Sequence, residues 1–380
     1  MSIFIRKPNI FSCVWILICL KIIMLNVSNR GIIDYLIWGI SCVCFFIYQK
    51  RLLNSQIAII GYPLWVLLFL QVVGLIQIFT IFSVTSIIAT FCIYCFIMVN
   101  SQLNMEIQHT YIKISFVITF LCVVFYLYKG AEVGNTLPGC MIFLAYGFLI
   151  SELTKDKAYY SSRKLNSIFY VVIIGIVYLC WIAEARTALF TIPIIVALYL
   201  FFPKKSQVAP ILFWGLVIGC ILVTLIYINI HSFSWYNMIN NWSILKFGKQ
   251  IDSSRPELWR IALNELEWWQ IIIGAGTGKL PSIARYRIAS FHNSYIQLLM
   301  QNGILGLSCL IMVFYRIWIK LSTHSNDVVV RLVLSTFVGI IIYNCFECTL
   351  LQNKAFLGII EWLILCMGLI RVRLLERSSY

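Results

Sequence analysis

Charged residues are scarce in this chain. Asp, Glu, Lys and Arg together make up 11% of its 380 residues, whereas hydrophobic residues make up 61%. Soluble domains carry about a quarter charged and about half apolar residues, so this composition excludes an ordinary soluble enzyme. It predicts an all-α polytopic membrane protein.

Side chains that bind metals are few or dispersed. The chain has four histidines, and its 14 cysteines are spread over apolar segments, where cysteine behaves as a small hydrophobic residue. Two pairs have the C-x-x-C form, Cys92 with Cys95 and Cys345 with Cys348, but neither has a second ligand pair beside it. We therefore expect no metal and no cofactor.

A nucleotide-binding loop is missing too. The run from Gly274 to Lys279 is rich in glycine, yet Ile273 stands where the first glycine is needed and Leu280 where a Ser or Thr is needed. We expect this run to form a turn that ends a helix, with Lys279 as a supporting contact for an anionic ligand. The sequence thus predicts no nucleotide partner.

Long apolar runs are abundant. About 20 apolar residues are needed for a helix to cross the hydrocarbon core of a membrane. Twelve runs fit, although 56–99 is nearly continuous and its division is the least certain; they are 10–27, 31–48, 56–76, 80–99, 111–128, 138–153, 167–184, 187–203, 209–230, 292–319, 331–349 and 355–371. We find neither an internal repeat nor a low-complexity linker, so we expect residues 1–380 to form a single integral membrane domain.

Basic residues predict the orientation of these spans. With the N-terminus inside, 17 of the 29 lysines and arginines fall in or beside inside loops, as expected for cytoplasmic loops. Both termini are then cytoplasmic, and residues 231–291 form one large extracytoplasmic loop. This distribution explains most of the net charge of +15, so we expect membrane lipids rather than nucleic acid as partners.

The large loop departs from the charge rule, because it carries seven basic residues: Lys246, Lys249, Arg255, Arg260, Lys279, Arg285 and Arg287. Long loops are translocated largely regardless of charge, so the orientation stands. One interpretation is a solvated face or contact with anionic lipid headgroups. The other is that part of this basic set receives an anionic substrate at the membrane surface.

The middle of the loop predicts a helix. Ser254 and Glu257 fit the S-x-x-E capping box, Pro256 fits the first turn, and amphipathic residues continue to position 269. Arg255 would then lie at a helix N-terminus, where backbone N–H groups and the helix dipole favour anions and a guanidinium adds a bidentate fork. The alternative is a surface arginine beside a cap.

His292 and Asn293 open the apolar segment that follows the loop. The helix dipole and nearby arginines disfavour an imidazolium there, and a neutral imidazole can accept a proton. His292 is therefore a candidate general base, the alternative being a hydrogen-bonded structural histidine. Asn293 is a candidate supporting residue.

Two further charges lie near the ends of predicted spans. Arg186 lies in a very short outer turn between two spans, and Glu347 at the outer end of another. Such charges are costly near lipid and are usually paired or functional. Arg186 has a local alternative partner in Glu184, while Glu347 is placed to orient an arginine or His292.

Together these residues resemble a known family. The set is Arg186, Arg255 in SSRPELW, the GAGTG run, His292 in HNSYIQLLMQNGILG, and the N-x-F-E form of Asn344 to Glu347. It resembles bacterial O-antigen ligases of the wider O-antigen ligase and polymerase group. The resemblance in motif covers about 186 to 350.

This resemblance implies a glycosyltransferase of the bacterial inner membrane with a periplasmic active site and no metal or cofactor. The donor would be a glycan linked to undecaprenyl diphosphate, and the acceptor would be the lipid A-core oligosaccharide. By matching position, Arg186 and Arg255 would bind the donor diphosphate, and His292 would take the proton of the acceptor hydroxyl, with inversion at the transferred sugar.

Two alternatives remain open. A polymerase of the same lipid-linked repeat units would share the donor chemistry and differ in the acceptor. A flippase or other transporter should place its polar residues at mid-membrane in interrupted helices, whereas here they gather in an outer loop. The sequence therefore favours an enzyme, and a ligase first.

Overall fold

The computed structural model describes residues 10–24, 31–52, 58–102, 109–128, 136–155, 163–182, 185–202, 208–247, 250–280, 290–351 and 355–378. Within these ranges all regular structure is helical and no strand occurs. The predicted all-α class is confirmed.

The helices follow one another along the chain with short connections. They are α1 (Ile10–Ile23), α2 (Gly31–Leu52), α3 (Ala58–Gln77), α4 (Ile81–Gln102), α5 (His109–Tyr128), α6 (Thr136–Lys155), α7 (Arg163–Ile182), α8 (Arg186–Phe201), α9 (Ala209–Ile228), the 3₁₀ turn η3 (Ile230–Ser232), α10 (Tyr236–Phe247), α11 (Arg255–Asn264), α12 (Trp268–Ile273), α13 (Ser294–Ser322), α14 (Val328–Tyr343) and α15 (Ala355–Ser378).

Each of the twelve predicted apolar runs coincides with one of these helices, with ends that differ by a few residues. The uncertain stretch 56–99 divides into α3 and α4. The reason is local: the Thr80 hydroxyl accepts the backbone N–H of Ser83 at 3.1 Å, which caps the start of α4.

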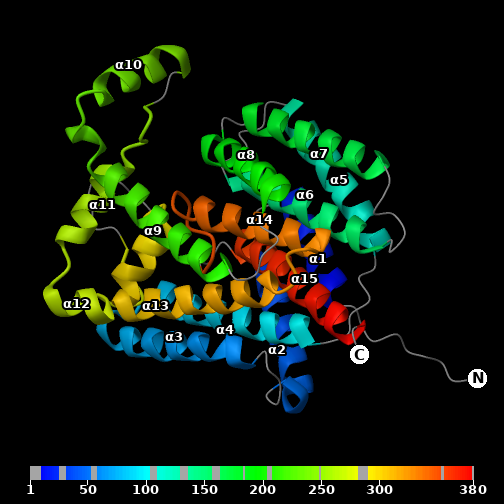
Figure 1. Ribbon diagram of the computed structural model, residues 1–380. Coiled ribbons are helices and arrows are strands. Elements are labelled where there is room, and N and C mark those ends of the chain that lie inside the picture. The colour runs from blue at the N-terminus through cyan, green and yellow to red at the C-terminus, as the bar shows by residue number, and fades with distance from the viewer. Residues whose placement is uncertain are drawn as a thin grey trace, which may run out of the picture.

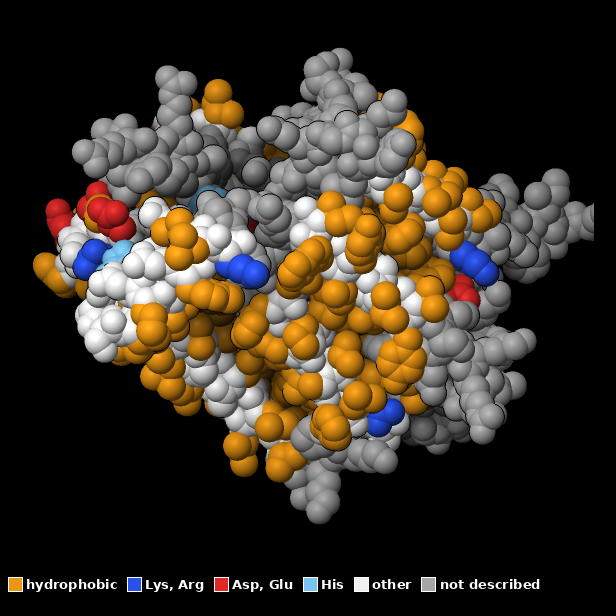
Figure 2. All heavy atoms as spheres, turned by 90° about the horizontal axis from the view of Figure 1, so that it is seen from above, with side chains coloured by type: hydrophobic (Ala, Val, Ile, Leu, Met, Phe, Trp, Pro, Cys, Tyr) orange, Lys and Arg blue, Asp and Glu red, His pale blue; other side chains and the backbone are white. Residues whose placement is uncertain are grey.

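Membrane crossing is less fully supported than helix formation. By length and composition, α9 and α13 are apolar and long enough to cross a membrane, and shorter apolar helices occur elsewhere in the described ranges. Hydrophobic side chains cover much of one face of the bundle (Figure 2), including exposed residues of α7 and α9 such as Val171 and Ile218. Twelve crossings therefore remain a prediction.

Helix α13 lies beside α3, and α14 packs between α8 and α15. The segment from α10 to α12 lies on the side of the molecule away from the C-terminus (Figure 1). The large loop of the sequence therefore forms a helical layer at one end of the bundle, and this layer carries several of the residues singled out above.

A bend in α13 fixes the position of α12. Gly303 has a φ of +64°, and a Cβ there would lie 2.2 Å from the carbonyl oxygen of Ile272. The bend leaves the Met300 carbonyl free to accept the N–H of Ala275 at 2.8 Å. Only glycine allows both the conformation and the close approach, so the bend joins the outer layer to the bundle.

Two local predictions in this layer are wrong. The helix predicted from Ser254 to 269 is divided between α11 and α12, because Glu267 forms a capping box with Gln270 and begins a new helix. Ser254 does not form the expected capping box, since its φ of +58° turns its side chain away from the helix amides.

Candidate active site

Three segments far apart in sequence meet around a cavity of about 520 Å³. They are the start of α8, the segment before α11 and the turn after α14, joined by the end of α9. The lining residues are Ala185, Arg186, Thr187, Ala188, Phe190, Tyr227, Ile251, Ser253, Arg255, Tyr343, Phe346 and Glu347. The charged groups among them are two guanidinium groups and one carboxylate, so the cavity favours an anion.

Arg186 is the first residue of α8 and reaches across to the segment before α11. Its Nη1 donates to the Gln250 carbonyl at 2.8 Å, and its Nη2 donates to Ser253 Oγ at 3.2 Å. The side chain is exposed toward the cavity. The alternative partner Glu184 lies outside the described residues.

Arg255 is the first residue of α11 and is held from the opposite wall. One side-chain nitrogen donates to the Phe346 carbonyl, and Nη2 donates to Glu347 Oε1 at 3.1 Å. Its side chain is only 15% exposed, so this is an oriented contact rather than a solvated surface charge. The position at a helix start agrees with the sequence prediction, although the capping box does not form.

His292 lies two residues before α13 rather than in its first turn, as was predicted. It has a φ of +52°, which is unusual for a residue other than glycine. The neighbouring Phe291 carbonyl accepts the indole N–H of buried Trp259 at 2.6 Å, which ties α11 to this point. His292 thus projects, 42% exposed, from a backbone that is fixed on both sides.

Asn293 supplies the second fixed side. Its side-chain oxygen accepts the N–H groups of Tyr295 at 2.9 Å and Ile296 at 3.0 Å, so it is the N-cap of α13. The residue is fully buried. Asn293 therefore supports the position of His292 through the backbone.

Glu347 connects the arginine with the histidine. One carboxylate oxygen accepts from Arg255, and the other lies 3.9 Å from His292 Nδ1. The second distance is too long for a hydrogen bond but close enough for the carboxylate to favour one imidazole orientation. His292 does not line the cavity itself; it lies next to it through Glu347.

Sequence reasoning missed Glu361, which is fully buried in α15 behind this turn. Its carboxylate accepts from Thr349 Oγ1 at 2.8 Å and from Asn344 Nδ2 at 3.2 Å. Asn344 Oδ1 in turn accepts from Ser294 Oγ at 2.6 Å, at the start of α13. This network joins the turn that carries Glu347 to the helix preceded by His292. A carboxylate inside an apolar run was its only signal in the sequence.

Sequence reasoning also set aside His231, which belongs to a second buried cluster. Asp252, 2% exposed, lies 2.6 Å from His231 Nε2 and accepts from Tyr236 Oη at 2.9 Å, both through Oδ2. Burial acts to raise the pKa of Asp252, but the bonds from His231 and Tyr236 outweigh it, so the pKa is lowered. Burial and the bond to this carboxylate raise the pKa of Tyr236 to about 12. Asp252 is therefore ionised at neutral pH.

Lys279 is not brought to the cavity. Its Nζ pairs with Glu265 at 3.2 Å, and it is absent from the lining residues. The glycine run around it packs against the bundle instead, where Thr277 donates to the Gln71 carbonyl at 2.7 Å. Arg285 and Arg287 lie outside the described residues. In the ranges that the structure covers, no three His, Cys, Asp or Glu side chains form a group that could hold a metal ion.

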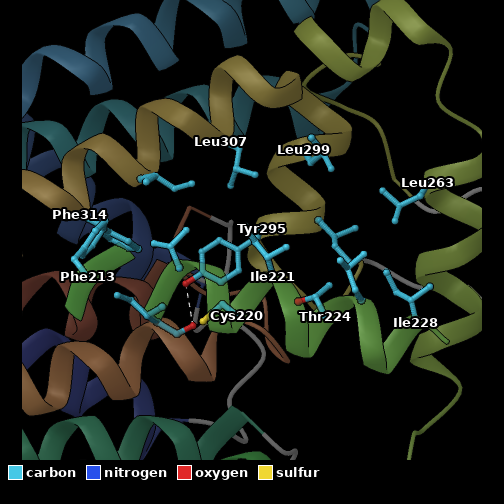
Figure 3. Close-up of a pocket in the computed structure, with 15 residues that line it drawn as sticks. Phe213, Cys220, Ile221, Thr224, Ile228, Leu263, Tyr295, Leu299, Leu307 and Phe314 are labelled. Carbon is cyan, nitrogen blue, oxygen red and sulfur yellow. Dashed lines mark hydrogen bonds between the residues drawn. The ribbon is translucent and has the colours of Figure 1, made fainter. Parts of the chain in front are cut away.

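A second, apolar cavity of about 200 Å³ lies between α9 and α13 (Figure 3). Its walls are made by aliphatic and aromatic side chains, among them Phe213, Ile221, Leu263, Leu299, Leu307 and Phe314. Tyr295 crosses it and donates to the Ile341 carbonyl at 2.9 Å. On α9, Ile228 lines this cavity whereas the adjacent Tyr227 lines the polar one, so one helix end borders both.

The comparison with known families agrees with the geometry. Residues 169–311 match the family described as O-antigen ligase. The match covers less than half of the chain, from α7 to the middle of α13, and includes Arg186, Arg255 and His292. No curated protein sequence matches the chain. Through residues 169–311, the chain is a member of the O-antigen ligase family.

Proposed function

We propose that this protein is an O-antigen ligase, a glycosyltransferase that moves O-antigen polysaccharide from undecaprenyl diphosphate to the lipid A-core oligosaccharide. The observation that carries the proposal is the pair Arg186 and Arg255 on one cavity, with Glu347 and His292 beside it. Guanidinium groups from two separate helices suit a diphosphate, which offers several oxygens in two directions.

The proposed reaction is a single displacement at the anomeric carbon of the donor sugar. The acceptor hydroxyl oxygen forms a bond to that carbon while the bond to the diphosphate oxygen breaks, which inverts the configuration. His292 takes the proton of the hydroxyl. Arg186 and Arg255 stabilise the negative charge that develops on the departing undecaprenyl diphosphate. The energy comes from the glycosyl phosphate bond, and neither a metal nor a nucleotide is required.

Glu347 would hold His292 in the orientation that the reaction needs. The 3.9 Å between Glu347 Oε2 and His292 Nδ1 leaves room for the bond to shorten when substrate binds, as catalytic hydrogen bonds often do. A carboxylate on Nδ1 would leave Nε2 free to accept the proton. The half-exposed position of His292 suits an acceptor that approaches from outside the cavity.

The apolar cavity supports a lipid-linked donor rather than a soluble one. It lies on the flank of α9, whose outward residues such as Ile218 and Leu222 are more than half exposed. Because the end of α9 borders both cavities, a molecule with a diphosphate head and a hydrocarbon tail would fit the two together.

The proposal includes a topology. We infer twelve spans, both termini in the cytoplasm, and residues 231–291 in the periplasm, from the distribution of basic residues. A reporter fused at about residue 245 should be periplasmic, and reporters near 157 and 377 cytoplasmic. A cytoplasmic signal at 245 would remove the active-site assignment, because the site and its substrates would then lie on opposite sides of the membrane.

A polymerase of the same lipid-linked repeat units is the second candidate, since it would use the same donor site. Lipopolysaccharide from a deletion strain separates the two. Loss of a ligase should leave lipid A-core without long chains and polymerised glycan on the lipid carrier. Loss of a polymerase should leave a single repeat unit on the core. A one-repeat band in the gel would overturn the ligase proposal and favour the polymerase.

A further inference from the structure

The cluster around Asp252 lies behind the two arginines and touches no part of the cavity. Its carboxylate is bound by His231 and Tyr236, while its backbone carbonyl accepts from Tyr227 Oη at 2.8 Å and from the N–H of Arg255 at 3.1 Å. Asp252 Oδ1 also accepts the N–H of Ser254 at 3.3 Å. Asp252 therefore joins the end of α9, the start of α10 and the start of α11.

The segment that Asp252 holds makes the contacts of Arg186. Gln250 supplies a carbonyl and Ser253 a hydroxyl to the Arg186 guanidinium, and these residues lie on either side of Asp252. Arg255 follows three residues after Asp252. One buried carboxylate thus lies between the contacts of one arginine and the backbone of the other.

The same segment has an unfavourable backbone. Ser253 and Ser254 have φ values of +51° and +58°, which cost about 1 to 2 kcal/mol for each residue that is not glycine. Such a conformation persists only where surrounding contacts determine it, and the bonds to Asp252 are the buried contacts of this turn. Without them the turn should relax and move both arginines.

We propose that Asp252 is a positioning residue, which sets the separation and direction of the Arg186 and Arg255 guanidinium groups through the segment 250–254. His231 and Tyr236 hold its carboxylate in place. The inference rests on the proposed function, because it assigns to these arginines the binding of the donor diphosphate. The carboxylate itself does not touch the substrate.

The test uses the full chain, purified in detergent, with inorganic pyrophosphate as the probe. We expect Asp252→Asn to weaken pyrophosphate binding about tenfold or more, since a misplacement of about 1 Å is costly at such sites. His231→Gln and Tyr236→Phe each remove one bond to the carboxylate and should give smaller losses. Ser232→Ala removes a nearby bond to the Asn229 carbonyl and should bind as the wild type does.

A double-variant comparison separates positioning from general destabilisation. If Asp252 acts through the arginines, Asp252→Asn should weaken pyrophosphate binding little further in an Arg186→Ala, Arg255→Ala background. Additive losses would overturn the inference, and so would wild-type affinity in Asp252→Asn. If Asp252→Asn fails to fold, unchanged affinity in both His231→Gln and Tyr236→Phe would overturn it. Normal binding by the double arginine variant would instead refute the proposed diphosphate site.

Discussion

The starts of α11 and α13 both bring a functional side chain to the same place, but they are built differently. Arg255 follows two serines with left-handed backbones, and His292 is itself left-handed. At α13, Asn293 caps the helix with its own side chain. At α11, Ser254 makes no cap bond, and the turn is held by Asp252 through residues of α9, η3 and α10.

This difference separates two ways of placing a catalytic group. The start of α13 is determined locally, because the capping oxygen and the amides it binds lie within three residues. The start of α11 depends on tertiary contacts, because its backbone is unfavourable without them. We therefore expect substitutions near His292 to act on chemistry or on one helix, and substitutions near Arg255 to act on several elements at once.

The largest effect is expected at His292. His292→Ala should lower the rate of glycan transfer about 10²- to 10⁴-fold, the usual contribution of a general base. His292→Asn should do the same, although asparagine tolerates the left-handed backbone and keeps the local fold. Transfer rates and protein levels in membranes would be measured together.

The matched control for His292 is His324, which lies in the turn after α13 at the other end of that helix. His324→Ala should transfer glycan at the wild-type rate. Full activity in His292→Asn would show that the residue is needed for its backbone conformation and not for its imidazole.

The next largest effect is expected at Arg255. Arg255→Lys keeps the charge but cannot reach the Phe346 carbonyl and Glu347 as a fork, so we expect transfer to fall about tenfold to a hundredfold. Arg260→Lys, at an exposed position on the same helix, serves as the control. Equal activities of the two variants would return Arg255 to the role of a surface arginine beside a helix start.

A moderate effect is expected from removal of the local cap. Asn293→Ala should lower the free energy of unfolding by about 1 to 2 kcal/mol, because the N–H groups of Tyr295 and Ile296 lose their acceptor. Asn293→Ser, which keeps a capping oxygen, should retain most of the stability. Thermal unfolding in detergent measures both. An Asn293→Ala protein as stable as the wild type would contradict local determination of this helix start.

The smallest effect is expected at Ser254. Ser254→Gly relieves the left-handed conformation without removing a cap bond, so it should leave stability unchanged or raise it by about 0.5 to 1 kcal/mol. Ser253→Gly relieves the same strain but also removes the hydroxyl that accepts from Arg186, so it should lower transfer. Similar transfer rates in the two variants would show that this hydroxyl does not orient Arg186.

The sequence by itself determined the features that depend on near neighbours. Runs of apolar residues predicted the helices, because a helix satisfies its own backbone groups wherever apolar side chains continue. Arg255 was correctly placed at a helix start, and the resemblance of the Arg186, Arg255 and His292 segments was confirmed by the family match. The roles of these residues stay predictions.

The tertiary structure decided which of these residues meet. Glu347 approaches Arg255 across 92 positions of sequence, Arg186 binds a segment more than 60 positions away, and Lys279 turns to Glu265 instead of the cavity. Asp252 and Glu361 gained their partners only when separate helices packed together. Local patterns fix the backbone within a few residues, whereas the packing of the bundle determines which distant side chains share one cavity. The sequence therefore predicted the groups of the site but not the contacts that hold them.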